Sequence, residues 1–134
     1  MQNLRKMKVN QIAIELIVRD VAETVEFYQS TLGFELLVSE EEEGKMYWAK
    51  LEMKGFYVSF KEEQRLKKEV DFMKDHPIGG SIAICLQVED LTGFYNKVSE
   101  ACELLDHPHL TPCGATQFSM KDNNGYIITV ERFG

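Results

Sequence analysis

The chain contains the same apolar segment twice. Residues 12–21 read IAIELIVRDV and residues 82–91 read IAICLQVEDL, with six of ten positions identical at an offset of 70 in a chain of 134 residues. A chain of this length forms one compact domain, so each copy belongs to one half of a shared fold. The repeat therefore predicts two similar modules that bury a common core.

The likeness continues to the end of each half. Residues 48–60 read WAKLEMKGFYVSF and residues 118–130 read FSMKDNNGYIITV, and the shift of 70 places Gly55 on Gly125. Both stretches are typical of hairpins with a glycine where the turn needs a positive φ. A three-residue loop with a bulge and a two-residue turn at Lys54-Gly55 both remain possible in the first hairpin.

A helix is expected after each copy of the first strand. Asp20 is a good N-cap with Glu23 three residues on, and Gly33 supplies a stop. Asp90 caps the second helix, whose apolar stripe continues as far as Leu105. These signals predict helices over 20–32 and 90–105.

Each half then reads strand, helix and three strands, which predicts an α+β fold. We expect one domain over 1–134, made of βαβββ modules at about 9–61 and 81–132. The spacing of Leu66, Val70 and Met73 predicts a short helical linker within 62–80. The expected strands are 10–18, 34–40, 45–53 and 56–61, then 81–88, 109–113, 115–121 and 126–132.

Composition excludes several classes of protein. With 15 basic and 22 acidic residues the net charge is -7, which disfavours binding to a nucleic-acid backbone. No apolar run reaches the roughly 18 residues of a membrane span, and MQNLRKMKVN has no apolar stretch behind it that would make a signal peptide. We expect a cytoplasmic protein. The three cysteines are an odd number without C-x-x-C spacing, so no disulfide framework or zinc knuckle is indicated, and Cys85 and Cys102 are expected to be buried thiols.

Two segments resemble the vicinal oxygen chelate superfamily, which includes glyoxalase I, extradiol dioxygenases, fosfomycin-resistance enzymes and bleomycin-resistance proteins. They are VRDVAETVEFYQSTLGFEL at 18–36 and FSMKDNNGYIITVE at 118–131, in which Asn123 replaces the proline of the family's turn. The resemblance implies that the two modules pair their sheets into a cup-shaped cavity. It also implies a homodimer, because the family usually builds its sites at a dimer interface.

In the metalloenzyme members four cavity-facing side chains bind a divalent ion. Carried over to this chain, those positions are Ala13, Ser59, Ala83 and Thr129. Two methyl groups and two hydroxyls do not supply the imidazole, carboxylate or thiolate donors that such an ion needs. We therefore expect no metal and no cofactor.

Strand alternation predicts which side chains line the cavity. The residues that share the parity of the four carried-over positions are Glu15, Ile17, Tyr57, Ser59, Cys85, Gln87, Ile127, Thr129 and Glu131. A three-residue first loop adds Tyr47, Ala49, Leu51, Gln117, Ser119 and Lys121, and turns Trp48 and Phe118 toward the helices. A two-residue turn would instead turn Trp48 into the cavity.

Glu15 is the most informative of these residues, because a carboxylate inside IAIELIV needs a partner if it is buried. It is either an anionic contact for a ligand or half of a structural pair, with Lys121 or a tyrosine as the partner. The three histidines, His76, His107 and His109, are interpreted as surface or structural residues. Cys85 has no adjacent histidine or lysine and is interpreted as an inert thiol.

The resulting hypothesis is a metal-free protein that binds and sequesters a small molecule such as an antibiotic, resembling the bleomycin-resistance proteins. The acidic balance favours a cationic ligand. An aromatic ligand is also expected, and an apolar metabolite with no antibiotic role fits the same residues equally well. The alternatives are a divalent-metal lyase, isomerase or dioxygenase, a metal-independent catalyst that uses Glu15, and a protein-contact domain that uses the charged runs at 40–43 and 65–68.

Overall fold

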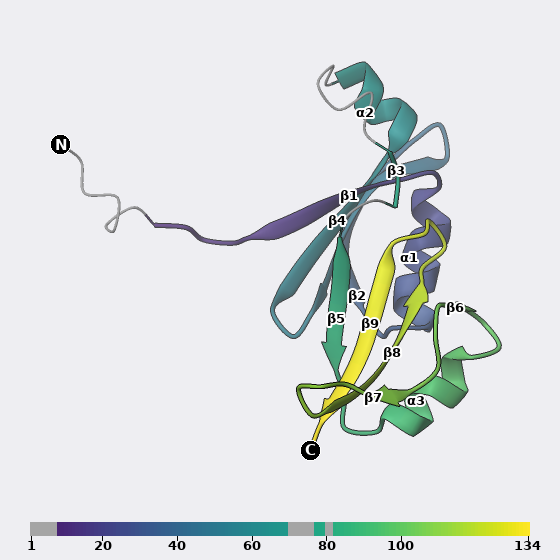
Figure 1. The fold of residues 1–134 in the computed structure, drawn as a ribbon. Helices are drawn as coiled ribbons and strands as arrows, with labels where there is room; N and C mark the ends of the chain where they lie inside the picture. The colour runs from purple at the N-terminus through teal and green to yellow at the C-terminus, as the bar shows by residue number, and fades with distance from the viewer. Residues whose placement is uncertain (1–7, 70–76, 80–81) are drawn as a thin grey trace.

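The computed structural model describes residues 8–69, 77–79 and 82–134 and has two β-sheets with three helices in that part of the chain (Figure 1). The first half contains β1 (Ala13–Val18), α1 (Val21–Ser30), β2 (Glu35–Glu42), β3 (Lys45–Met53) and β4 (Phe56–Glu62), followed by α2 (Glu63–Glu69). The second half contains β5 (Ala83–Gln87), α3 (Leu91–Val98), β6 (Glu103–Leu104), β7 (His109–Leu110), β8 (Ala115–Lys121) and β9 (Ile127–Phe133).

The strand order repeats between the halves. The first sheet runs β1-β4-β3-β2, and the second runs β5-β9-β8-β6 with β7 also paired to β8. In each sheet the first strand pairs in parallel with the last, and Ala13 lies opposite Tyr57 as Ala83 lies opposite Ile127. These two pairs differ by the 70 residues of the sequence repeat, so the predicted α+β fold of two βαβββ modules is confirmed.

Both predicted helix starts are confirmed. The Asp20 side chain accepts a hydrogen bond from the Glu23 backbone N–H at 2.9 Å, and Asp90 does the same for Gly93 at 2.9 Å. Each carboxylate satisfies a backbone donor that the first turn of a helix leaves free. Gly33, with φ +81°, then turns the chain out of α1 toward β2.

The second helix is shorter than predicted, since α3 ends at Val98 and not at residue 105. The Val98 carbonyl accepts bonds from the N–H groups of Ala101 and Cys102, at 3.0 and 2.9 Å, which closes the helix. The next residues form β6, because β8 offers them backbone partners, and the Leu105 N–H donates to the Ser119 carbonyl. Similarly, β7 covers only two residues of the predicted strand 109–113.

Each sheet buries one face in a core that the two modules share. The buried cluster includes Leu16 and Val58 of the first sheet together with Ile128 and Val130 of the second. These residues have even numbers, and the odd-numbered side chains of the same strands lie on the opposite face. Phe118, which also belongs to the buried cluster, packs on the rings of Phe94 and Tyr95, so it faces the helix as predicted.

A polar clasp joins the turn between β8 and β9 to the first module. The Tyr28 hydroxyl of α1 donates to Asp122 Oδ2 at 2.8 Å, and the Tyr126 hydroxyl donates to the Ile17 carbonyl at 2.7 Å. Thr24 Oγ1 accepts bonds from the amide groups of Asn123 and Asn124 at 3.1 and 2.9 Å. Asn123 therefore makes a bond between the modules that a proline at this position could not make.

The linker and the N-terminal segment differ in how they meet the fold. In α2, Leu66 is buried as predicted, while Val70, Met73 and His76 lie outside the described residues. Residues 8–12 precede β1, which begins three residues later than predicted, and they extend away from the two sheets as an arm (Figure 1). Within the described residues no helix has the length and apolarity needed to cross a membrane.

Candidate functional site

On the outer face of the first sheet, Glu15 lies at the centre of a small polar cluster. Its Oε1 accepts hydrogen bonds from the Trp48 indole N–H at 3.1 Å and from the Ser59 hydroxyl at 3.0 Å. Glu15 is exposed and Ser59 is buried beneath it. The structural partners of the carboxylate are therefore a tryptophan and a serine, and not the lysine or tyrosine suggested by the sequence.

The first hairpin adopts the two-residue turn. Met53 pairs with Phe56, and Lys54 and Gly55 have φ values of +50° and +82°. Those signs are typical of a type I′ turn, which matches the twist of the two strands. Trp48, which lies opposite Lys61 across the strands, is thereby placed on the outer face.

This register contradicts part of the predicted cavity wall. Ala49 and Leu51 are completely buried in the shared core, on the opposite face from Trp48. Tyr47 lies at a β-bulge, and its ring packs under the Arg65 guanidinium of α2, 3.9 Å from the ring centroid. The prediction that Tyr47, Ala49 and Leu51 face the cavity is wrong. It assumed a three-residue loop, but Lys54 adopts the left-handed conformation that usually favours asparagine or glycine, and this allows the two-residue turn.

Lys50 and Tyr57 extend the outer face of the first sheet. The Lys50 ammonium lies 5.2 Å from the centroid of the Tyr57 ring and also donates to the Gln11 side chain. Trp48, Lys50 and Tyr57 are half-buried. This face therefore offers a ligand the rings of Trp48 and Tyr57, the Glu15 carboxylate and the Lys50 ammonium group, among others.

The outer face of the second sheet carries hydroxyl and amide groups. Ser119 and Thr129 lie opposite each other, with their hydroxyl oxygens 2.9 Å apart, as the sequence pattern predicts for one face. Gln117 lies opposite Glu131, and Gln87 pairs with Glu131 on its other side. Neighbouring Lys121 forms an ion pair with Glu103 at 3.3 Å.

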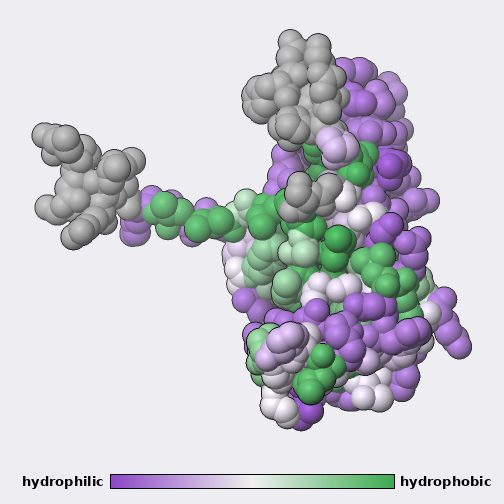
Figure 2. Space-filling view, viewed as in Figure 1, coloured by the Kyte–Doolittle hydropathy of each residue, from purple (hydrophilic) through white to green (hydrophobic). Residues whose placement is uncertain are grey.

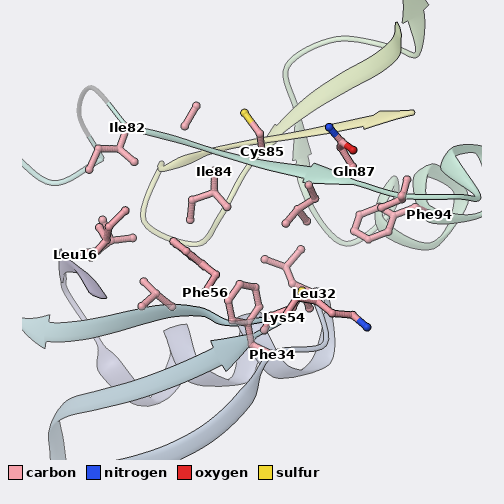
Figure 3. A pocket seen from close by; sticks show the side chains of 16 residues that line it. Leu16, Leu32, Phe34, Lys54, Phe56, Ile82, Ile84, Cys85, Gln87 and Phe94 are labelled. Atoms are coloured by element: carbon pink, nitrogen blue, oxygen red, sulfur yellow. The ribbon is translucent and has the colours of Figure 1, made fainter. Parts of the chain in front are cut away.

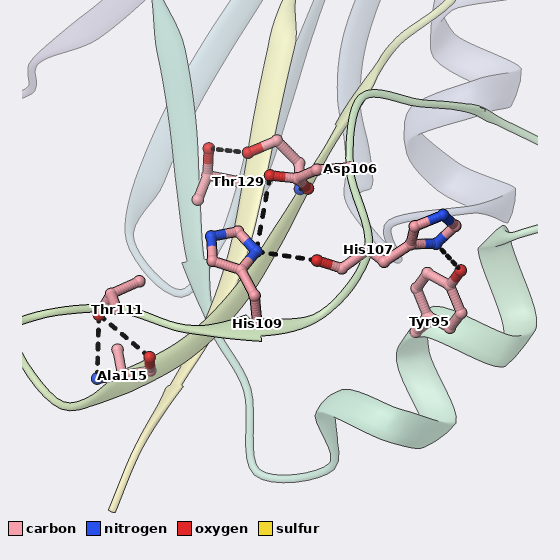
Figure 4. A network of polar contacts seen from close by, with 8 residues as sticks. Tyr95, Asp106, His107, His109, Thr111, Ala115 and Thr129 are labelled. Atoms are coloured by element: carbon pink, nitrogen blue, oxygen red, sulfur yellow. Dashed lines mark hydrogen bonds and ion pairs between the residues drawn. The ribbon is translucent and has the colours of Figure 1, made fainter.

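Two further residues on this face were missed as site residues. Asp106 Oδ1 accepts the Ser119 backbone N–H at 2.7 Å, and its Oδ2 lies 3.7 Å from His109 Nδ1 (Figure 4). The same Nδ1 is 2.8 Å from the His107 carbonyl oxygen, which can only accept, so Nδ1 carries the hydrogen. His109 lies opposite Gln117, so its ring is on the same face as Ser119 and Thr129. No sequence motif marks this arrangement, because pairing of β7 with β8 creates it.

The predicted site residues Ile17 and Cys85 differ in accessibility, and so do the two thiols predicted to be buried. Ile17 is 9% exposed, and only its carbonyl is used, by Tyr126. Cys85 is exposed rather than buried, whereas Cys102 is half-buried, and burial raises the pKa of the Cys102 thiol. Of the predicted buried thiols, only Cys102 is even partly covered.

The four positions that hold a metal in related enzymes occupy equivalent places in the two sheets. Ser59 lies opposite Glu15, and Thr129 lies opposite Cys85. Both hydroxyls are already bonded within their own sheet, Ser59 to Glu15 and Thr129 to Ser119. Within the described ranges, no three His, Cys, Asp or Glu side chains come together in a group that could hold a metal ion.

Comparison with known proteins agrees with this architecture. The profile of the Glyoxalase/Bleomycin resistance protein/Dioxygenase superfamily matches residues 8–130. The chain belongs to this superfamily. A search of curated proteins gave no match to this glyoxalase-superfamily chain.

Solved structures with the same fold include three of interest. A glyoxalase/bleomycin resistance protein/dioxygenase family enzyme from Burkholderia phytofirmans PsJN has a TM-score of 0.76 at 14% identity, covering 91% of this chain and 97% of its own. TioX from Micromonospora sp. ML1 has a TM-score of 0.69 at 17% identity, and the match covers 94% of this chain and 100% of TioX. TnmS3, an antibiotic binding protein from Streptomyces sp. CB03234, has a TM-score of 0.68 at 23% identity, and the match covers 96% of this chain and 99% of TnmS3. At these identities the likeness establishes the fold.

The two outer faces do not close on each other within one chain of this glyoxalase-superfamily protein. The faces that carry Leu16 and Val58 in the first sheet, and Ile128 and Val130 in the second, form the shared core, so the faces that carry Glu15 and Thr129 lie on the outside. A cavity of about 510 Å³ does exist in the described part of the chain, but it lies between β5 and the strands β1 and β4 (Figure 3).

Proposed function

We propose that this protein binds and sequesters a small molecule without a metal ion, and that it does so as a homodimer. The observation that carries the proposal is the chemistry of the four metal positions of the fold. Two are alanines, and the hydroxyls of Ser59 and Thr129 are bonded to Glu15 and Ser119. These groups can shape and hydrogen-bond a ligand, but they are poor donors for a divalent ion.

The dimer follows from the outward orientation of both faces. A second copy can place the outer face of its second module against the outer face of the first module, and a twofold axis then produces two equal cups. The N-terminal arm supports this arrangement, because Val9 and Ile12 are 72% and 77% exposed. Apolar side chains so far from the fold are typical of a segment that packs on a partner.

The class of ligand follows from the first face. Trp48 and Tyr57 offer flat apolar surfaces, and the exposed Glu15 carboxylate offers negative charge. An aromatic ligand with a positively charged group fits both, through stacking and charge-assisted hydrogen bonds. The antibiotic binding described for TnmS3 supports an antibiotic of this kind, and a cytoplasmic location would suit its sequestration.

The test uses the single tryptophan of the chain, which stands in the proposed site. Purified protein is incubated with zinc, nickel, manganese and iron, desalted, and its metal content is measured by elemental mass spectrometry. It is then titrated with bleomycin, with and without EDTA, by calorimetry and by Trp48 fluorescence. We expect less than about a tenth of an ion per chain, and binding heat that EDTA leaves unchanged.

A charge-neutral variant tests the role of Glu15. Glu15→Gln should weaken bleomycin binding several-fold, whereas Glu26→Gln, an exposed change on α1, should leave the affinity unchanged. About one ion per site after desalting would refute the metal-free mechanism. Absence of binding heat would refute the antibiotic ligand, and a monomer by light scattering at working concentration would refute the shared cup.

A further inference from the structure

The cavity between the two sheets is a different place from the proposed site. It is bounded by β5 on one side and by β1 and β4 on the other. Figure 3 shows Ile84 pointing from β5 toward Leu16 and Phe56, while the neighbouring Cys85 points the opposite way from the same strand. The deep part of the cavity therefore lies on the side of Ile84, and its rim extends around β5 to Ala83, Cys85 and Gln87.

The lining of this cavity is almost entirely hydrocarbon. Phe34, Phe56 and Phe94 supply aromatic walls, and Leu16, Leu32 and Ile84 supply aliphatic ones. The volume of about 510 Å³ is within the range of pockets that hold small organic molecules. Such a lining offers water few hydrogen bonds, so an apolar ligand that replaces water there gains free energy.

The cavity reaches the protein surface, where apolar residues remain in contact with solvent. Ile14 and Ile82, which both line it, are 38% and 39% exposed. Figure 2 shows apolar side chains gathered across the middle of the face on which β1 and β5 lie. An opening of this kind gives a small molecule a path to the buried walls without separating the modules.

One charged side chain lines the cavity. Lys54 is exposed in the turn between β3 and β4, and within the described part of the chain its ammonium makes no ion pair. A lysine can lay its aliphatic stem along apolar groups while its ammonium stays in water. Gln87 and Cys85 are the other polar lining residues, and neither is charged in its ordinary state. The one charged group among the described residues that line this cavity is therefore positive.

We propose that the inter-sheet cavity binds a small amphipathic carboxylic acid. Its apolar body lies between Ile84 on β5 and Phe56 on β4, and its carboxylate lies at the surface beside Lys54. This site differs from the cup on the outer faces, because its walls are the inner side chains Leu16, Phe56 and Ile84, and the two sites meet only at the rim of β5. A protein of this fold would then carry two ligand sites of different chemistry.

The test compares decanoate with 1-decanol, which shares its chain but has no charge. Calorimetric titration should show binding of both, with decanoate tighter. Lys54→Met should weaken decanoate about threefold to fivefold and leave 1-decanol unchanged, as for loss of one exposed ion pair. Equal binding of the two compounds by the unaltered protein would refute the carboxylate selectivity.

Two substitutions to phenylalanine locate the site. Ile84→Phe places a larger side chain in the cavity and should abolish decanoate binding, whereas Leu110→Phe, at an exposed residue of β7 that does not line the cavity, should retain it. Unchanged binding by folded Ile84→Phe would overturn the proposal, and Lys54→Met decides it if that variant does not fold. Quenching of Trp48 by decanoate would place the ligand on the outer face and also overturn it. Binding that disappears as the protein is concentrated would show instead that a second copy covers the cavity.

Discussion

The clasp between the modules makes a strong prediction about Tyr28. This side chain is completely buried, and its hydroxyl donates to Asp122 Oδ2 at 2.8 Å. Tyr28→Phe keeps the ring, which packs on Phe34 and Phe60, and removes only the hydroxyl. The remaining bonds to the carboxylate come from the backbone N–H groups of Asn124 and Tyr126, both to Oδ1. Oδ2 therefore loses its side-chain donor in a buried environment.

The size of the effect follows from that loss. A buried hydrogen bond to a charged group contributes about 1.5–3 kcal/mol to stability. For a chain of this length we expect each kcal/mol to lower Tm by about 3–5 °C, so Tyr28→Phe should lower it by roughly 5–15 °C. Tyr95→Phe is the matched control, because its hydroxyl bonds to His107 at an exposed site. The control should lower Tm by less than about 2 °C.

The loss of stability in Tyr28→Phe should also depend on pH. Burial raises the pKa of Asp122, and the Tyr28 hydroxyl lowers it in opposition. Because the pKa of Asp122 is higher in the folded protein than in the unfolded chain, folding favours the protonated carboxyl. This contribution to stability is fully present below the pKa of the unfolded chain and is lost as the pH rises through the pKa of the folded protein. Removing the hydroxyl raises the folded pKa further, so Tyr28→Phe should destabilise more at pH 7.5 than at pH 4. Differential scanning calorimetry at both values tests this, and an equal or smaller loss at pH 7.5 would refute the reasoning.

Two further substitutions test the core and the second turn. Phe118→Ala empties a completely buried position against two aromatic rings and should cost about 3–5 kcal/mol in urea denaturation, and a loss below about 1 kcal/mol would mean that the helix does not pack there. Gly125→Ala should cost about 1–2 kcal/mol, because φ is +93° while the added Cβ would meet no atom within 4 Å, and a neutral result would show that the turn changes its backbone conformation. Cys113→Ser, at an exposed position, serves as control for both and should be close to neutral.

The repeat predicted the fold because both copies preserve strand alternation and the aspartate cap. Asp20 and Asp90 could be identified as caps since their bonds are local, within three residues. The end of α3 could not be predicted, because the apolar spacing continues to Leu105 while the backbone pairs with β8 instead. A helical period does not reveal a competing strand partner elsewhere in the chain.

The face of Trp48 depended on a single turn. Lys54 at φ +50° is uncommon for a residue with a long side chain, so the sequence alone did not decide between a two-residue and a three-residue loop. A one-residue difference moves every side chain of β3 to the other face, which is why Tyr47, Ala49 and Leu51 were placed incorrectly together. In the second hairpin the same reasoning placed Gln117, Ser119 and Lys121 correctly on one face.

The outer faces of the two modules carry different side chains, and this difference determines how a shared cup would orient its ligand. The parallel pairs retain one geometry, but Glu15 in the first module corresponds to Cys85 in the second across the 70-residue shift. The first wall therefore has two aromatic rings beside Glu15, while the second has the hydroxyl groups of Ser119 and Thr129 with Glu131 near them. Because a cup of the proposed dimer would take one wall from each kind of module, its two sides would differ in aromatic surface. A ligand with a cationic aromatic end and a hydroxyl-rich end would then bind in one orientation, which a symmetrical duplication could not impose.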